Sequence, residues 1–67
     1  MIKVGDLVDT KFGVSEIIGI ELCENIGDKY GIPVEEIEAD LKNYCVFDLE
    51  NGHWQRGLQI TVYDKEV

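Results

Sequence analysis

The sequence predicts one small, mostly β domain covering residues 1–67. We expect a bent antiparallel sheet or small barrel of about four to five strands, with one short helix or helical turn in the middle loop. Three observations favour this class. Apolar and polar residues alternate over 14–24, an Asn-Gly pair at 51–52 separates two further alternating runs, and the only proline interrupts the segment between them. A chain of 67 residues has no room for a second domain.

The first third of the chain predicts two strands joined by a tight turn. Residues 3–10 read as the first strand, which ends at 11–13, where Gly13 can adopt the positive φ of a turn. The second strand covers 14–24. Its period-2 pattern places three residues on one apolar face, Ile18, Ile20 and Leu22.

The middle segment, residues 25–43, fits two secondary structures. A helix is favoured by Pro33, which suits a first helical position, and by charges that complement the helix dipole at its two ends, Glu35, Glu36 and Lys42. A strand is compatible too, because apolar and charged residues alternate over 37–42. We expect a helical turn or short helix over residues 34–42.

The strongest local signal is Asn51-Gly52, the preferred pair for a two-residue type I′ hairpin. Such a loop fixes the register, so that Leu49 faces Trp54 and Phe47 faces Arg56. The predicted core face is Cys45, Phe47, Leu49, Trp54, Arg56, Leu58 and Ile60. The opposite face is Asp48, Glu50, His53, Gln55, Gln59 and Thr61. Arg56 would then be a charge on the apolar face that must be satisfied there.

Composition argues against several classes of partner. Fourteen Asp and Glu against six Lys and Arg give a net charge of −8, which is unsuited to direct binding of nucleic acid. No apolar run approaches the roughly 18 residues of a membrane span, so no membrane partner is expected. The start of the chain lacks the apolar core of a signal peptide, and we expect a cytoplasmic protein.

The sequence holds no recognisable catalytic or metal-binding pattern. Cys23 and Cys45 are the only cysteines and His53 the only histidine, too few for a four-ligand Cys/His zinc site in one chain. We expect two reduced packing cysteines, with a disulfide as the alternative. The only serine, Ser15, lies in no nucleophile or phosphate-loop motif. A non-enzyme without metal or cofactor is therefore predicted.

Four residues are candidates for a ligand site: Trp54, Arg56, Tyr30 and Lys29. A guanidinium beside an aromatic ring suits a phosphate next to a nucleobase. Lys29 and Tyr30 belong to the one segment long enough to cover such a ligand. Structural roles stay open beside this one. For Arg56 the alternatives are a position over Trp54, a pair with an acidic residue, a bulge that turns it outward, or a contact with a second copy. For the other three residues the alternative is packing or a solvated side chain.

Four carboxylates fall within six positions: Glu35, Glu36, Glu38 and Asp40. The simpler interpretation is a solvated surface that keeps a small protein in solution. The alternative is an interface that imitates nucleic-acid phosphates and occupies the basic groove of a nucleic-acid-binding protein.

The opening of the chain resembles SH3-like barrels of the KOW type. The likeness rests on Val-Gly-Asp-Leu-Val at 4–8, the glycine at 13 and Ile-Ile-Gly-Ile at 17–20, where a Gly-Asp turn leads into a strand, a glycine turn and a second strand. KOW segments usually bind RNA or protein through a basic surface. The eight net negative charges of this chain argue against the implied RNA binding and not against the implied fold. The hairpin at 49–54 is similar to those of small phage and mobile-element proteins.

Two functions follow as hypotheses. The first is a non-catalytic binder, a phage-type antagonist of host defence, that captures a nucleotide-like ligand between the subunits of a homo-oligomer. A domain of this size encloses too little volume for such a pocket within one chain. The alternative is an acidic inhibitor that binds a basic host protein through the surface at residues 35–40.

Overall fold

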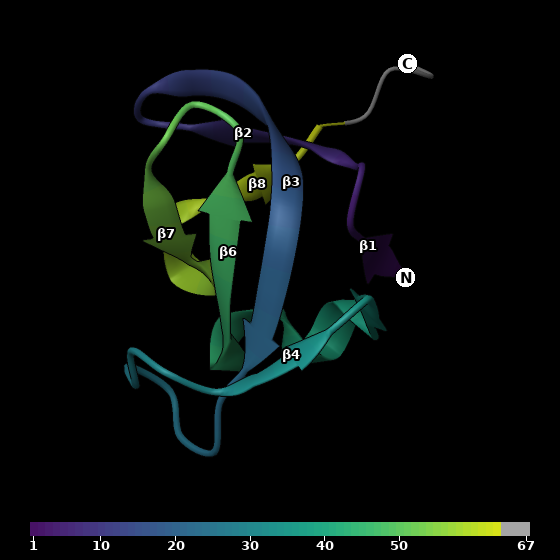
Figure 1. Ribbon diagram of the computed structural model, residues 1–67, viewed down its shortest axis with the longest axis vertical. Coiled ribbons are helices and arrows are strands. Elements are labelled where there is room, and N and C mark those ends of the chain that lie inside the picture. Colours follow the sequence, from purple (N-terminus) through teal and green to yellow (C-terminus); the bar gives the residue numbers. More distant parts are fainter. Residues whose placement is uncertain (64–67) are drawn as a thin grey trace.

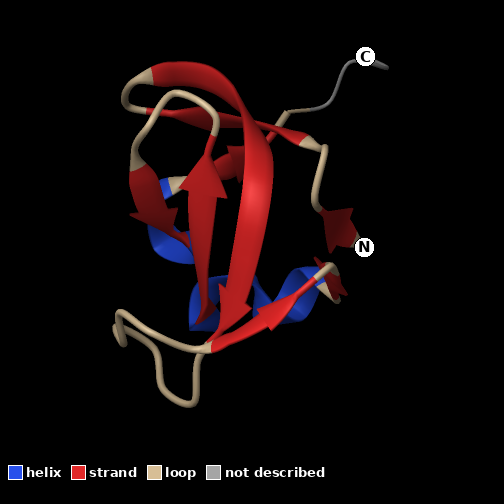
Figure 2. Ribbon diagram, in the orientation of Figure 1, coloured by secondary structure: helices blue, strands red, loops and turns tan. Residues whose placement is uncertain are grey.

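The computed structural model describes residues 1–63, and over these the chain is mostly β, with no long helix (Figure 1, Figure 2). The strands are β1 (Ile2–Lys3), β2 (Leu7–Thr10), β3 (Gly13–Leu22), β4 (Ile32–Val34), β5 (Glu36–Ile37), β6 (Cys45–Leu49), β7 (Trp54–Arg56) and β8 (Thr61–Val62); η1 (Ala39–Tyr44) and η2 (Gly57–Gln59) are 3-10 helices. The predicted fold class is confirmed. The sheet is bent and antiparallel, and it does not close into a barrel.

The sheet is organised around β3, the long curved strand in Figure 1. The strand order is β7-β6-β3-β2-β8, with β4 also paired to β3, while β1 and β5 form a separate two-stranded sheet. The first half of β3 pairs with β2, and its second half lies between β6 and β4. Because β3 pairs with β2 at one end and with β6 and β4 at the other, the sheet bends along β3.

A bulge in β3 changes which of its residues are buried. The pairing with β6 shifts between Ile17 and Gly19, so Ile18 has no partner on β6. Because the bulge adds one residue to β3, residues 17 and 20 point to the same face although they are three positions apart. Ile17 and Ile20 are both buried, whereas Ile18 is 56% exposed. The prediction that Ile18 shares the apolar face with Ile20 is therefore wrong.

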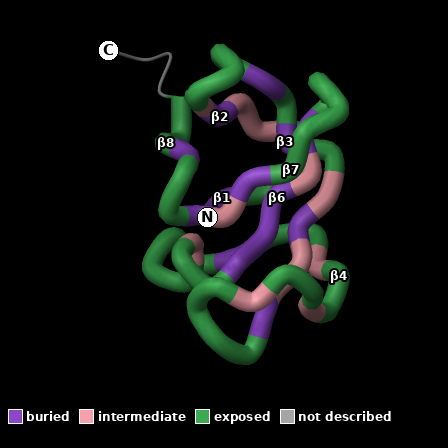
Figure 3. The backbone as a smooth tube through the Cα atoms, turned by 90° about the vertical axis from the view of Figure 1, so that its left-hand side faces the viewer, coloured by how far each residue is buried: buried purple, intermediate pink, exposed green. Residues whose placement is uncertain are grey.

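The core lies on one face of the bent sheet. Its buried members are Ile2, Val8, Ile17, Ile20, Ile37, Cys45, Phe47, Leu49 and Ile60. In Figure 3 the buried segments include most of β6. Strand β6 pairs with a neighbour on each side, and this central position explains why four of its five residues are buried.

The middle segment contains both structures that its sequence allows, in succession. Residues 32–34 form β4 and pair with β3, so Pro33 lies in a strand and not at the start of a helix. A proline is tolerated there because β4 is an edge strand, which has one side free of ladder hydrogen bonds. The helical turn begins at Ala39 and ends at Tyr44, later than predicted. Within residues 1–63, no helix is long and apolar enough to cross a membrane.

The predicted β6–β7 hairpin is present, but its turn differs. The Gly52 N–H donates to the Leu49 carbonyl at 3.1 Å, and the Leu49 N–H donates to the His53 carbonyl at 3.0 Å. Gly52 has a φ of +89°, whereas Asn51 keeps a negative φ. These features define a three-residue loop, a type I turn followed by a left-handed glycine, instead of a type I′ turn. The Asn51 side chain accepts a hydrogen bond from the His53 N–H at 3.0 Å.

The longer loop shifts the register by one residue. Asp48 faces Trp54, Phe47 faces Gln55, and Val46 faces Arg56. A shift of one residue moves every β7 side chain to the other face. The prediction that Trp54 and Arg56 belong to the core is therefore wrong. Leu58 is exposed as well, because it belongs to η2.

The observed register also changes which hairpin residues face the core. Gln55, expected on the polar face, is 5% exposed and lies on the core side. The assignment of Cys45, Phe47, Leu49 and Ile60 to the core is confirmed.

Candidate functional site

The candidate site is on the sheet face opposite the core, here called the outer face. Its residues come from two cross-strand rows, Glu21, Val46 and Arg56 in one and Gly19, Asp48 and Trp54 in the other. Residues 23–31, the 23–31 loop, connect β3 to β4 and return across this face. The site therefore brings together three segments that are distant in sequence.

Two hydrogen bonds hold the 23–31 loop against the sheet. The Gly31 N–H donates to Glu21 Oε1 at 3.2 Å, and Arg56 Nε donates to the Gly27 carbonyl at 3.2 Å. A side chain at position 31 would collide with the Leu22 carbonyl. Glycine is thus required where the loop rejoins β4. Within the loop, Asp28 accepts a hydrogen bond from the Asn25 N–H at 3.1 Å, which closes a local turn.

The four predicted ligand residues lie close together, although Trp54 and Arg56 reach the site by the face opposite to the predicted one. The Arg56 Cζ lies 5.3 Å from the Trp54 ring centroid, and the Lys29 Nζ lies 6.0 Å from it. The placement of Arg56 over Trp54 matches the structural role considered for this residue. Tyr30, next to Lys29, is 81% exposed, and Trp54 is 40% exposed.

A pocket of about 140 Å³ lies between the 23–31 loop and the outer face. Its lining residues are Glu21, Lys29, Tyr30, Val46, Asp48 and Trp54. Sequence reasoning missed Glu21 and Asp48. Each is a polar member of an alternating run, which is the available signal, but only the pairing of β3 with β6 shows that the two carboxylates share a face.

The carboxyl of Asp48 is partly buried in the pocket, close to a second carboxylate. Burial, followed by repulsion from Glu21, raises the pKa of its carboxyl above the ordinary value. The carboxyl fits over β3 because Gly19 has no side chain; a Cβ there would lie 3.0 Å from Asp48 Oδ2. The pocket therefore combines two neighbouring carboxylates with the aromatic side chains of Trp54 and Tyr30.

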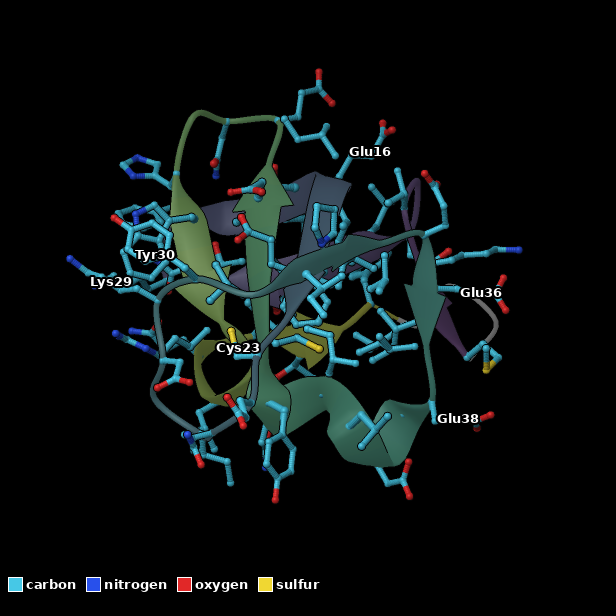
Figure 4. All side chains as sticks on the ribbon, turned by 60° about the horizontal axis from the view of Figure 1, so that its bottom comes forward. Glu16, Cys23, Lys29, Tyr30, Glu36 and Glu38 are labelled. Carbon is cyan, nitrogen blue, oxygen red and sulfur yellow. The ribbon has the colours of Figure 1, made fainter. Side chains whose placement is uncertain are left out.

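The predicted acidic surface occupies a different region, here called the acidic edge. Its members, Glu35, Glu36, Glu38 and Asp40, are all exposed and lie between the end of β4 and the first turn of η1. Figure 4 shows Glu36 and Glu38 on one side of the molecule and Lys29 and Tyr30 on the other. The structure thus separates the acidic edge from the pocket.

The residues considered for catalysis have structural contacts. Cys23 and Cys45 are buried free thiols, and burial raises the pKa of both, that of Cys45 to about 11. The His53 ring stacks on Phe12 with centroids 3.8 Å apart, and Ser15 Oγ accepts a hydrogen bond from the Asn51 N–H at 3.4 Å. Within residues 1–63, no group of three or more His, Cys, Asp and Glu is arranged to hold a metal ion.

No protein-family model, curated protein or solved structure matches this chain. The chemistry of the pocket and of the acidic edge is therefore the basis for a functional assignment. Both regions present carboxylates. The cations Lys29 and Arg56 are next to the Trp54 ring, where they cover part of its surface.

Proposed function

We propose that this protein is a non-catalytic binding protein that captures a basic protein. The partner class is a nucleic-acid-binding protein whose basic groove accepts the acidic edge in place of phosphates. The observation that carries the proposal is the distribution of charge. In addition to a net charge of −8, carboxylates form the exposed acidic edge and supply two of the six residues that line the pocket.

The dimensions of the molecule support a protein partner. The molecule measures 32 × 23 × 18 Å. A standard protein interface covers about 800 Å² of each partner, while the whole surface is 4439 Å². One interface of ordinary size therefore covers about a fifth of the surface, enough for the acidic edge, and a partner that also contacts the pocket must extend around the molecule. A nucleotide-sized ligand needs about 300 Å³ or more, which exceeds the pocket of about 140 Å³.

The physical effect of the acidic edge would be on the rate and specificity of association. Exposed like charges attract an oppositely charged groove over about 10 Å at 0.1 M salt and raise the association rate. Binding should weaken steeply with added salt, and duplex DNA should compete for the same groove. Capture would be stoichiometric, in the manner of a phage-type antagonist of host defence. The reduced thiols of Cys23 and Cys45 suit the cytoplasm.

Native mass spectrometry of the protein purified from its host cells tests this proposal. We expect a 1:1 complex with a basic protein that duplex DNA dissociates. A variant with Glu35→Gln, Glu36→Gln, Glu38→Gln and Asp40→Asn should lose the complex. The matched control carries Glu16→Gln, Glu24→Gln, Glu50→Gln and Asp9→Asn, which change the charge equally at four other exposed positions. Equal loss in both variants would show that net charge alone acts, and would contradict the assignment to the acidic edge.

A second candidate is the capture of a nucleotide-like ligand between copies of the chain. It is favoured by the convergence of Lys29, Tyr30, Trp54 and Arg56, because two cations beside aromatic rings suit a phosphate next to a base. The exposed Tyr30 would contact the second copy. This candidate requires a homo-oligomer, whereas phosphate mimicry works as a monomer. A co-purified small molecule in an oligomer would support it over the basic partner.

A further inference from the structure

The pocket has the chemistry of a site for a positively charged group. Glu21 and Asp48 supply carboxylates from neighbouring strands, and Trp54 and Tyr30 supply aromatic side chains. Aromatic faces and carboxylates both attract cations, and the attraction grows when water is partly excluded. An anion entering the pocket would instead meet two negative groups at short range.

We propose that this pocket binds the cationic side chain, arginine or lysine, of the basic partner protein. This inference rests on the proposed function and identifies the contact that anchors the partner beyond the acidic edge. A volume of about 140 Å³ matches the end of one side chain better than a whole nucleotide. Val46, which is buried beneath the loop, provides an apolar surface for the methylene stem.

Lys29 brings a cation of the protein itself to the aromatic side of the pocket. Its Nζ lies 6.0 Å from the Trp54 ring centroid, it lines the pocket, and it is exposed. A solvated lysine on a loop is displaced at low cost because it leaves no buried group unpaired. Arg56 differs, since its Nε is bound to the Gly27 carbonyl and keeps the loop in place. Lys29 is thus an internal competitor, while Arg56 is a structural residue.

The environment of Asp48 agrees with this assignment. Burial and the neighbouring Glu21 both raise the pKa of its carboxyl, which means that the ionised form of Asp48 is disfavoured in the free protein. A cation bound between the two carboxylates would offset the repulsion. Lys29 lines the same pocket, but its Nζ lies at the Trp54 ring, 6.0 Å from the ring centroid.

Fluorescence of the only tryptophan, Trp54, provides a direct test. The probes are N-acetyl-arginine amide and N-acetyl-lysine amide, with N-acetyl-citrulline amide as the neutral isostere of the first. We expect saturable changes with the two cations and none with citrulline. The stronger of the two cations identifies the preferred side chain. Saturable binding of adenosine or guanosine monophosphate with no binding of the cations would overturn the inference.

Three variants assign the binding to this pocket. Asp48→Asn and Glu21→Gln should each weaken cation binding roughly three- to tenfold, and Gln at position 21 retains an acceptor for the Gly31 N–H. Lys29→Met, which keeps an apolar stem, should tighten cation binding several-fold. Glu16→Gln is the matched control for Glu21→Gln, because Glu16 is exposed on the same strand, β3, and lies away from Lys29 and Tyr30 (Figure 4). Weaker cation binding by Lys29→Met would contradict the role of competitor.

The same variants separate this inference from the proposed function. If the basic protein is captured and Glu21→Gln leaves both that capture and cation binding unchanged, the pocket is not the anchor, although the proposed function stands. If the cations bind as expected but no basic protein is captured, the pocket assignment stands and the proposed partner is wrong. Circular dichroism of each variant checks folding, and Lys29→Met at an exposed position decides the matter if Asp48→Asn fails to fold.

Discussion

The two faces of the β6–β7 hairpin differ although they are built from alternate residues of the same strands. On the inner face, Phe47, Leu49 and Gln55 are almost completely buried. On the outer face, Asp48 and Arg56 are half-buried and Trp54 is 40% exposed. The inner face is selected by packing against the core, while the outer face is free to carry charge. A shift of one residue in register exchanges these roles.

Val46 is the exception on the outer face, and it shows what the 23–31 loop contributes. It is buried even though it faces away from the core, because the loop passes over it. The pocket therefore exists only where loop and sheet meet. Changes that act on the inner face should affect stability, and changes that act on the outer face should affect binding.

The largest expected effect is on the inner face. Phe47→Ala should lower the free energy of unfolding by about 3–5 kcal/mol, because it removes a fully buried aromatic ring from the core, and a domain of this size has little more than that to lose. Trp54→Ala is the matched change on the outer face, and it should cost less than half as much. Urea unfolding followed by circular dichroism measures both. Equal losses would mean that the two faces are not distinct.

The turn that sets the register should give the next largest effect. Gly52 has a φ of +89°, a conformation that costs an L-residue about 1–2 kcal/mol. Gly52→Val should lower the stability by at least that amount. Gly52→Asn should lower it less, because asparagine tolerates the left-handed conformation. Similar losses for valine and asparagine would show that backbone conformation at this position does not limit stability.

Gln55 is a polar residue that the observed β6–β7 register places on the core side. Its Nε2 donates to the Trp54 carbonyl at 3.0 Å, but its Oε1 has no hydrogen-bond partner among residues 1–63. A buried acceptor without a partner costs about 1–3 kcal/mol. We expect Gln55→Met, of similar size, to raise the thermal unfolding temperature by an amount that corresponds to about 1 kcal/mol. A fall in that temperature would show that the amide is needed in the core.

The smallest effect concerns Asp48 on the outer face and depends on pH. The pKa of its carboxyl is higher in the folded protein than the ordinary 3.8. This carboxyl therefore stabilises the folded protein fully when the pH is below the ordinary pKa, and the contribution is lost as pH rises through the folded-state pKa. Asp48→Asn should therefore be more stable than the wild type at neutral pH, by less than about 1 kcal/mol.

The pH dependence of this difference is the check. It should disappear near pH 3, where wild-type Asp48 is protonated in both states. Asp9→Asn, at an exposed position of β2, is the control and should show no comparable gain. A gain for Asp48→Asn that is the same at both pH values would mean that ionisation is not its cause.

Local sequence predicts much of this fold. The alternation over 14–24 predicts β3, Asn51-Gly52 marks the β6–β7 turn, and the charged residues at 35–40 are exposed. These features depend on neighbours in the chain: a period of two, a glycine that reaches positive φ, and side chains that strongly favour water. Residue type alone selects Trp54, Arg56, Lys29 and Tyr30 as candidates, and in the structure they lie close together.

Tertiary contacts decided the rest. Asn-Gly fits both a two-residue and a three-residue loop, and the structure has the second, which turns Trp54 and Arg56 away from the core. Pro33 can begin a helix, yet pairing with β3 makes its segment a strand. The carboxylates Glu21 and Asp48 are 27 residues apart in sequence, and only the β3–β6 register brings them to one pocket. In each case the local sequence permits more than one arrangement, and pairing with distant strands determines which one forms.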